Sequence, residues 1–402
     1  MAQAFIFDSH PVQYKAPVYQ ELQRMRPGSF KVIYVSDCSV RGHHDKDFGQ
    51  RVAWDTPLMH GYPHMVLQNE RGVPLHGFRS LSGRGILALL KRDRPVAALI
   101  SQFLYASDLA AYLSCLYLGI PIWIRHETQD SAFIRPPWKT VLRHLFYRLA
   151  YRGVSHAFYI GQANREHLLN HGMPPARMTF SPYCTPPPRA GMDATAKQQA
   201  RNDLRATLGV AADETLLLFS GKFIDKKNPG LLLDTLGHLG PEELQKVKLV
   251  YVGSGVLDPI LRQRAAQFAG RVIFAGFVNQ GAMPDYYLAA DVLALPSRRA
   301  GETWGLVVNE ALQAGCGVVV SEAVGCHREF GGWERVRVIP DNDAAACAKA
   351  LRDLARFPRS FDWCASAIER YSTTVAARAV AAAIDNLATS GNTTSNAPCA
   401  SS

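Results

Sequence analysis

The sequence contains no apolar run long enough to cross a bilayer. Its most apolar segment, residues 95–124, is interrupted by Gln102 and Asp108 and broken at Gly119-Ile120-Pro121, which leaves no clean span of about 20 residues. The first residues, MAQAFIFDSHPVQYK, lack the charged-then-apolar layout of a secretory signal peptide. We therefore expect a protein that does not cross a membrane, with 95–124 folding as strand, helix and strand.

The sequence also lacks the cysteine patterns of a disulfide framework or a zinc site. Its eight cysteines form no CxxC pair and no His–Cys cluster at zinc spacing. They are Cys38, Cys115, Cys184, Cys316, Cys326, Cys347, Cys364 and Cys399. Such scattered cysteines are typical of a reducing compartment, so we expect reduced core thiols in a cytoplasmic protein.

Two cofactor motifs are missing as well. No strand leads into a GxGxxG, which disfavours a dinucleotide-dependent dehydrogenase. No DxD motif flanked by an apolar strand appears in the second half of the chain. The sequence therefore predicts a site that requires neither a metal nor another cofactor.

The composition is that of a soluble globular protein with a basic balance. The chain has 402 residues, 48% apolar and 19% charged, with a net charge of +10, and this length suggests two domains. The excess of positive charge favours an anionic partner, namely nucleic acid, acidic phospholipid or a phosphorylated substrate, unless the lysines serve solubility alone. No basic-aromatic RNA-binding motif is present, so we expect no nucleic acid.

Short β-branched runs alternate with helical patterns along most of the chain, which predicts parallel βαβ sheets. The expected strands of the first half are 4–10, 30–36, 96–101, 121–127 and 156–161. Those of the second half are 215–223, 247–255, 271–278, 291–297, 317–325 and 336–340. The fold class is thus α/β, with two doubly wound domains that face each other across a cleft.

The domain boundaries follow from the Pro-rich bridge at 181–199. We predict an N-terminal Rossmann-like domain over 1–185 for the acceptor, a linker at 186–200, and a C-terminal domain over 201–358 for the donor. Ala-rich helices over 359–387 are expected to pack back across the domains. The polar tail, 388–402, is expected to be disordered because it has little apolar surface to bury.

Basic residues gather where a C-terminal strand meets its helix. Lys222 ends the strand, and Lys226 and Lys227 follow at the next helix entry. Ammonium groups at the carboxyl edge of a sheet suit a diphosphate. The alternative is that these lysines only cap the strand.

Two glutamates, Glu302 and Glu310, stand in GETWGLVVNEALQAG with seven residues between them. Eight helical steps turn about 800°, so both acids face one cleft only if Glu302 lies outside the regular helix. The N–H groups of Thr303–Leu306 between them form an anion site. Carboxylates accept two hydrogen bonds from vicinal hydroxyls, so the pattern suits a nucleotide sugar. The alternative is a helix-capping Glu302 and a solvated Glu310.

Six motifs of the second half occur in the order and spacing of retaining glycosyltransferases of family 4. They are FSGKFIDKKNPGLLLDTL, VYVGSG, FAGFV, ADVLALPS, GETWGLVVNEALQAGCGVVVSEAVG and REF. The resemblance is close over 215–340 and looser before it. It implies the GT-B fold of two Rossmann-like domains, a Glu-x7-Glu motif, and retention of anomeric configuration.

By this resemblance, Lys222 and Lys227 bind the donor diphosphate, Glu302 contacts the transferred sugar and Glu310 holds the ribose. Thr303, Trp304, Gly305 and Leu306 border the donor, and the loop containing Gly276 and Phe277 contacts the base through its backbone. Two residues depart from the family pattern. Trp304 replaces the usual Phe, and Cys326 replaces the second Gly of a common Gly-Gly before Glu329. We therefore expect these two positions to influence which nucleotide sugar the protein accepts as its donor.

The first loop of the N-terminal domain, DSHPVQYKAPVY, has no Gly-Gly where relatives often carry one. Its side chains, His10, Gln13, Tyr14 and Lys15, are candidates for contacting donor or acceptor, unless the prolines merely shape the turn. His126 in the segment 124–127 is the candidate catalytic histidine, with Arg125 and Glu127 in support. A structural role for His126 remains the alternative.

The segment 133–159 contains cations but no acids. Its apolar residues fall at helical spacing on one face, between Lys139 and Arg143 on one side and Arg148 and Arg152 on the other. An apolar face with basic flanks is typical of a helix at an anionic membrane surface. The alternative is a helix that packs this face on the sheet.

These patterns together predict a cytoplasmic glycosyltransferase, peripheral on the inner face of the cell membrane. It would transfer a hexose-type sugar from a nucleotide sugar to a glycan or polyprenyl-diphosphate-linked acceptor in polysaccharide or glycoconjugate biosynthesis. A nucleotide-sugar-binding protein without transfer activity and a GT-B nucleotide-sugar epimerase are the alternatives.

Overall fold

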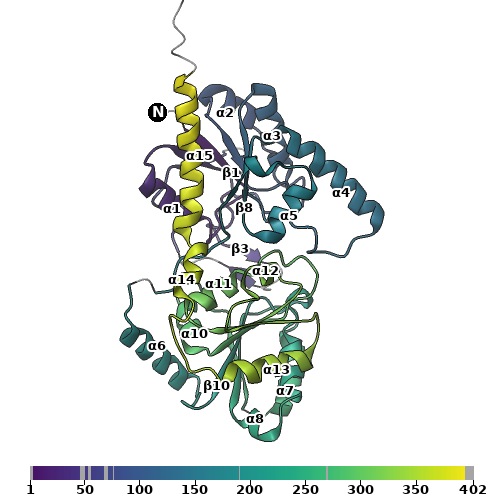
Figure 1. Cartoon of the computed structure of the whole chain (residues 1–402), viewed down its shortest axis with the longest axis vertical. Coiled ribbons are helices and arrows are strands. Elements are labelled where there is room, and N and C mark those ends of the chain that lie inside the picture. The colour runs from purple at the N-terminus through teal and green to yellow at the C-terminus, as the bar shows by residue number, and fades with distance from the viewer. Residues whose placement is uncertain are drawn as a thin grey trace, which may run out of the picture.

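The computed structural model describes residues 3–45, 50–52, 56–67, 71–75, 77–189, 191–268 and 270–393. Two α/β domains stand one above the other in Figure 1, with the N-terminal domain at the top. The last long helix, α15 (Thr373–Thr393), rises from the lower domain and runs along the upper one. The predicted fold class is therefore observed.

The N-terminal domain is built on a parallel sheet of seven strands in the order β5-β2-β1-β6-β7-β8-β9. The strands are β1 (Ala4–Asp8), β2 (Phe30–Tyr34), β5 (His64–Val66), β6 (Ala98–Ile100), β7 (Ile122–Ile124), β8 (His156–Tyr159) and β9 (Met178–Phe180). Its helices are α1 (Ala16–Met25), α2 (Ile86–Asp93), α3 (Ala106–Leu118), α4 (Pro137–Ala150) and α5 (Gln162–Asn170). A short antiparallel pair, β3 (His43–Asp45) and β4 (Gln50–Val52), lies outside the sheet.

The C-terminal domain has a parallel sheet of six strands in the order β12-β11-β10-β13-β14-β15. They are β10 (Thr215–Ser220), β11 (Val247–Val252), β12 (Val272–Gly276), β13 (Val292–Leu295), β14 (Gly317–Ser321) and β15 (Val336–Ile339). Their apolar sequences fit strands that helices cover on both faces. The order reverses between β10 and β13, and ligands of doubly wound sheets bind at such a switch point.

Helices surround the C-terminal sheet. They are α6 (Ala194–Thr207), α7 (Gly230–Gly237), α8 (Pro241–Gln245), α9 (Asp258–Ala265), α10 (Met283–Ala289), α11 (Leu306–Gln313), α12 (His327–Phe330), α13 (Ala344–Ala355) and α14 (Ala365–Ile368). The N–H of Ala346 donates to the carboxylate of Asp343, which caps α13.

All eleven expected strands are present, most of them shorter than predicted, and four further ones were missed. β3, β4, β5 and β9 have three residues each, too few to show a strand pattern. The expected linker, 186–200, contains the first half of α6, which packs on α10 of the C-terminal domain. The expected tail, 388–402, begins inside α15, and its residues 394–402 lie outside the described part of the chain.

The described cysteines agree with the expectation of buried thiols. All seven of them are free and buried, whereas Cys399 lies outside the described residues. Among the described helices, none is both long and apolar enough to span a bilayer.

The chain passes between the domains twice, and the two passages lie side by side. The first leaves β9 and the second leads into α15. The Ser181 hydroxyl donates to the Ala376 carbonyl oxygen at 3.1 Å, and the rings of Phe180 and Tyr371 meet at 5.8 Å. Beyond this point α15 packs on α1, and the Ala376 side chain is buried in the N-terminal core.

A second set of contacts joins the domains beside these passages. Gly161, at the start of α5, lies against the indole of Trp304. The Gln162 N–H donates to the Glu329 carboxylate, and the Gly301 N–H donates to the Ala132 carbonyl at 2.8 Å. Side-chain and backbone contacts therefore hold the two domains together in addition to the chain passages.

Replacing Gly161 by Ala should weaken this contact. A Cβ at Gly161 would lie 2.4 Å from a ring carbon of Trp304 and 2.8 Å from a Glu329 oxygen. Overpacking of this kind costs about 1–3 kcal/mol, so we expect a lower thermal unfolding midpoint. Gly237→Ala is the control, because nothing lies within 4 Å of a Cβ there. Equal midpoints for the two variants would contradict the prediction.

Candidate active site

A cleft of about 960 Å³ opens between the carboxyl edges of the two sheets. It lies beside the switch point of the C-terminal sheet, where the loops after β10 and β13 separate. Its polar lining residues are Gln13, Tyr14, Glu127, Tyr183, Ser220, Lys227, Gln280, Tyr287, Glu302, Thr303 and Glu310.

Glu302 and Lys227 form an ion pair across the switch point. The Lys227 Nζ lies 2.5 Å from Glu302 Oε2, and the Ser297 hydroxyl donates to the same oxygen at 3.3 Å. Burial opposes ionisation of Glu302, but the ammonium groups of Lys227 and Lys226 outweigh it and hold the pKa of Glu302 below its usual value. The acid is therefore a carboxylate at neutral pH.

Glu302 precedes the regular helix, as its spacing from Glu310 required. α11 begins at Leu306, after Gly305 takes a left-handed φ of 95°. A Cβ at Gly305 would come within 2.7 Å of Leu295 and Val324 side chains. Only glycine combines this φ with this space, so the glycine sets the turn that brings Glu302 to the cleft.

The other two lysines lie behind Lys227. The Lys226 ammonium donates to the Gly301 carbonyl at 2.8 Å, and burial lowers its pKa. Lys222 is near enough for its charge to lower the pKa of Lys226 further, but it does not line the cleft. Of the two lysines expected to bind diphosphate, the structure brings Lys227 into the cleft and leaves Lys222 outside its lining.

Backbone groups form part of the cleft wall. The first N–H groups of α11, at Leu306 and Val307, have no acceptor within the helix, and they carry the positive end of its dipole. Gly221 and Gly253, which follow β10 and β11, also line the cleft, but their N–H groups already donate to the Val252 and Gly276 carbonyls. The N–H donors that this wall offers to an anion are therefore those of the α11 N-terminus.

Glu310 reaches the cleft from the second turn of α11. Tyr287 OH donates to its Oε2 at 2.6 Å, and the Gln280 amide donates to its Oε1 at 3.1 Å. Burial raises the pKa of Glu310. Phe277 and Val278, which follow Gly276 at the end of β12, line the same end of the cleft.

The N-terminal domain contributes only part of its expected loop. Gln13 and Tyr14 line the cleft. Lys15 instead pairs with the buried Asp8 at 2.6 Å, and His10 accepts or donates one hydrogen bond with Ser9 at 2.9 Å. Neither Lys15 nor His10 belongs to the cleft lining, which corrects the expectation for these two residues.

Glu127, not His126, faces the cleft. Its carboxylate accepts hydrogen bonds from the Tyr183 and Thr303 hydroxyls. His126 is 4% exposed and stacks on Tyr151, and burial lowers its pKa to about 3. The strand was expected to run to residue 127 but ends at Ile124, so the side chains of 126 and 127 are placed by an irregular loop. His126 therefore does not line the cleft in this structure, and its catalytic role stays a prediction.

Trp304 contributes mainly to the contact between domains. Its ring is 3% exposed, donates to the Asn309 side chain at 2.8 Å, and meets Tyr183 edge-on at 6.1 Å. Cys326 is fully buried behind it, and its N–H donates to the Trp304 carbonyl at 3.1 Å. Trp304 lines the cleft with Gly305 and Leu306 although little of it is exposed, whereas Cys326 does not line it.

Sequence reasoning missed several residues that support the acids. Tyr183 and Tyr287 hold Glu127 and Glu310, and Gln129 donates to the Thr303 carbonyl at 3.2 Å. No motif signals them, because each acts through a contact between segments more than 20 residues apart.

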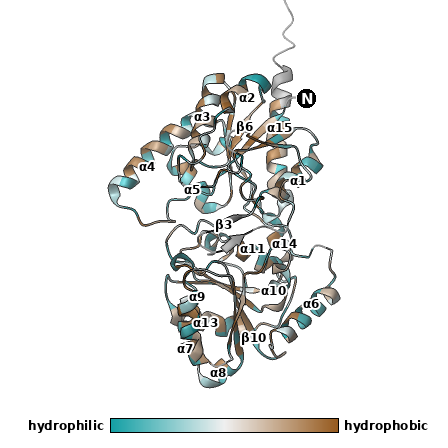
Figure 2. Cartoon of the chain, turned by 180° about the vertical axis from the view of Figure 1, so that it is seen from behind, coloured by the Kyte–Doolittle hydropathy of each residue, from teal (hydrophilic) through white to brown (hydrophobic). Residues whose placement is uncertain are grey.

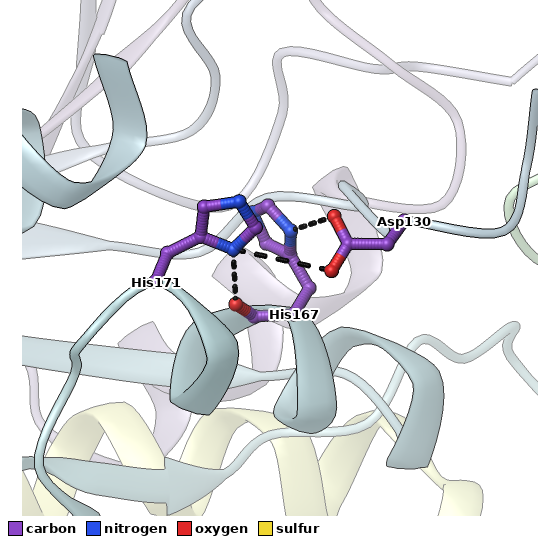
Figure 3. Close-up of side chains that lie close together, drawn as sticks. All are labelled: Asp130, His167 and His171. Carbon is purple, nitrogen blue, oxygen red and sulfur yellow. Dashed lines mark hydrogen bonds and ion pairs between the residues drawn. The ribbon is translucent and has the colours of Figure 1, made fainter. Parts of the chain in front are cut away.

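One group in the described residues has the composition of a metal site: Asp130, His167 and His171. Figure 3 shows these side chains turned toward one another. The His167 ring bonds Asp130 at 2.7 Å, and His171 Nδ1 bonds the His167 carbonyl at 2.7 Å. Arg143 also donates to Asp130 at 2.5 Å. Because the Arg143 guanidinium already balances the charge of the Asp130 carboxylate, we interpret this group as a hydrogen-bonded cluster.

Comparison with known families gives one match. Residues 200–361 match the family described as Glycosyl transferases group 1. An uncharacterized glycosyltransferase of Methanocaldococcus jannaschii is 33% identical over 168 residues, 40% of this chain and 42% of that protein. A phosphatidyl-myo-inositol mannosyltransferase of Mycobacterium leprae is 32% identical over 181 residues, 44% of this chain and 48% of that one. The matched part thus spans less than half of these relatives.

Comparison with solved structures covers nearly the whole chain. HepE of Anabaena in complex with UDP has a TM-score of 0.69 at 15% identity, covering 96% of this chain and 100% of HepE. WaaG, a glycosyltransferase of lipopolysaccharide biosynthesis, has a TM-score of 0.58 at 14% identity, covering 96% and 99%. The chain therefore has the fold of GT-B glycosyltransferases, and its C-terminal domain carries the group 1 sequence pattern.

The histidine cluster makes the N-terminal domain sensitive to acid. Burial lowers the pKa of His167 to about 4, whereas an unfolded histidine titrates at its ordinary pKa of about 6.5. Between these values the unfolded chain binds more protons, so stability falls as pH falls from about 6.5 to 4, by on the order of 2–3 kcal/mol. Urea unfolding across this range measures the loss. This loss of stability should be smaller in His167→Gln. It should be unchanged in His60→Gln, since His60 is exposed.

Proposed function

We propose that this protein is a retaining, metal-independent glycosyltransferase that moves a hexose-type sugar from a nucleotide-diphosphate sugar. The acceptor is a glycan or a polyprenyl-diphosphate-linked oligosaccharide, and the reaction takes place in the cytoplasm. The observation that carries the proposal is the presence of Glu302, Lys227, Glu310 and the α11 N-terminus in one cleft. The group 1 match and the UDP-bound HepE neighbour support it.

The donor fits the cleft in three parts. The diphosphate lies against the α11 amides and Lys227, which favour negative charge. Glu310 accepts hydrogen bonds from the ribose hydroxyls, a role for which Tyr287 orients it. The backbone near Phe277 contacts the base. Each part uses a group that the cleft already presents.

Lys227 changes partner when the donor binds. In the structure its ammonium neutralises Glu302 at 2.5 Å. A diphosphate carries more charge than one carboxylate, so it draws Lys227 away. Glu302 is then free to accept hydrogen bonds from the sugar hydroxyls. The ion pair thus keeps both groups in the charged form that binding needs.

The transfer step follows from this arrangement. The bond between the sugar C1 and the phosphate oxygen breaks, the acceptor oxygen bonds C1 from the same face, and its proton passes to the leaving phosphate. Helix amides and Lys227 stabilise the negative charge that develops on the leaving diphosphate. Glu302 orients the sugar, and Glu127 with Tyr14 borders the acceptor side.

A nucleotide-sugar epimerase is the second candidate. A putative UDP-N-acetylglucosamine 2-epimerase from Listeria monocytogenes has a TM-score of 0.60 at 16% identity. An epimerase changes its nucleotide sugar without an acceptor. Analysis of the products formed from donor alone separates the two reactions, since an epimerised nucleotide sugar would contradict transfer as the main activity. Binding without any turnover would favour a nucleotide-sugar-binding protein.

Substitution of the two acids should have different effects. Glu302→Ala is expected to reduce turnover at least 100-fold but to keep or raise UDP affinity, because Lys227 loses its competing carboxylate. Glu310→Ala should instead weaken UDP binding, by about 1–3 kcal/mol for charged hydrogen bonds. Calorimetric titration with UDP and a turnover assay measure both. Full turnover in Glu302→Ala would contradict the assigned role.

The donor itself is identified by a panel of nucleotide sugars. Only the true donor contacts both sugar and base sites, so it should raise the unfolding midpoint more than the free nucleotide does. Lys227→Ala is the matched variant and should lose most of this increase for every diphosphate ligand. If no nucleotide sugar raises the midpoint of the native chain, the proposed donor class is wrong.

A further inference from the structure

Helix α4 turns its apolar face away from the protein. Its six large apolar side chains are between 48% and 68% exposed. They are Trp138, Val141, Leu142, Leu145, Phe146 and Leu149. In Figures 1 and 2 the helix projects from the edge of the N-terminal domain. The alternative that this face packs on the sheet is therefore wrong.

The polar side of α4 faces inward. Arg143 bonds Asp130, and the rings of His144 and His171 meet at 5.0 Å. Tyr147 meets the His167 ring edge-on at 4.8 Å. The cluster in Figure 3 is thus the surface to which α4 is attached. This polar attachment leaves the apolar face without a partner inside the described chain.

Helix α3 adds a second exposed apolar stripe. Leu109, Leu113, Leu116 and Tyr117 recur at helical spacing and are between 38% and 73% exposed. The end of α4 lies beside α3, because Tyr112 OH donates to the Ala150 carbonyl at 2.6 Å. Phe103, in the loop just before α3, meets the Phe146 ring of α4 at 6.2 Å. We call these ten apolar residues of α3 and α4 the α3–α4 apolar face.

The charges along the α4 side of this face have one sign. Residues 131–165 contain no Asp or Glu, and the one acid of α3, Asp108, is buried. Lys139 and Arg148 are exposed on α4, and Arg152 is exposed just after it. Lys139 lies 5.2 Å from the Trp138 ring, and Lys91 lies 5.5 Å from the Tyr117 ring. The face is therefore apolar in its centre and cationic at its edge.

We propose that the α3–α4 apolar face docks on the surface of an anionic phospholipid bilayer. Apolar side chains would enter the boundary of the acyl region while the cations meet lipid phosphates. A second copy of this chain is a poor occupant, because two-fold pairing would bring the same cations together without an acid to match them. The face lies flat on the bilayer, since neither helix is long enough to cross it.

Docking would also bring the cleft close to the bilayer. Just before α4, Phe133 and Ile134 are 47% and 84% exposed. Phe133 pairs with Ala300 and packs against Gly301, which is followed by Glu302. A lipid-linked acceptor would thus reach the cleft without leaving the membrane. This last step rests on the proposed function, whereas the docking itself does not.

Vesicle sedimentation of the full chain tests the docking. Two kinds of vesicle are compared. One contains phosphatidylcholine with about 30% phosphatidylglycerol, which makes its surface strongly anionic. The other contains phosphatidylcholine alone. We expect binding to the anionic vesicles only, reduced at least tenfold in Leu142→Glu/Leu145→Glu. Lys139→Glu/Arg148→Glu should weaken it and reduce its dependence on salt.

Two matched variants and one fold control complete the experiment. Val256→Glu/Ile260→Glu changes exposed apolar residues of the C-terminal domain, and Lys349→Glu/Arg356→Glu changes exposed cations there. Both should bind vesicles like the native chain. Stabilisation by UDP shows that each variant is folded, and it reports separately on the proposed donor site.

The outcomes separate the proposal from its rivals. Loss of binding only in the two α4 variants supports it. Equal binding to neutral vesicles, or unchanged binding in Leu142→Glu/Leu145→Glu, overturns it. It is also overturned if light scattering shows a dimer that this variant abolishes while the native chain binds no vesicles, since the face would then cover a second copy.

Discussion

The two halves of the cleft meet where the start of α5 approaches Trp304. Gly161 has no side chain, so the indole lies directly on its backbone, and Glu329 reaches past it to the Gln162 N–H. Beside this contact, Gln129 donates to the Thr303 carbonyl and Thr303 donates to Glu127. A close approach of the two domains is therefore what places Glu127 and Glu302 in one cleft.

Sequence reasoning succeeded where a residue's environment is set by its own strand or turn. The six C-terminal strands are apolar on both faces, and Gly305 marks the turn that separates Glu302 from α11. It failed where a side chain depends on a distant partner. Lys15 turns from the cleft because Asp8 is buried nearby, and the loop after Ile124 buries His126 while exposing Glu127.

Helix α4 shows a different limit of sequence reasoning. Its pattern establishes that one face is apolar and the other polar, but an amphipathic pattern does not say which face meets the protein. The answer lies in Asp130, His167 and His171, which follow or precede α4 in the chain and offer it a polar surface. Arg143 fits that surface through its bond with Asp130. The orientation of the helix is thus decided by residues outside it.

The two chain passages between the domains have a mechanical consequence. Because Ser181 bonds Ala376 directly, both passages lie at one edge of the molecule, while the Gly161–Trp304 contact lies near the cleft. Two adjacent connections give the domains one shared edge. A relative rotation about that edge would stretch the chain least there and would separate Glu127 from Thr303 at the cleft.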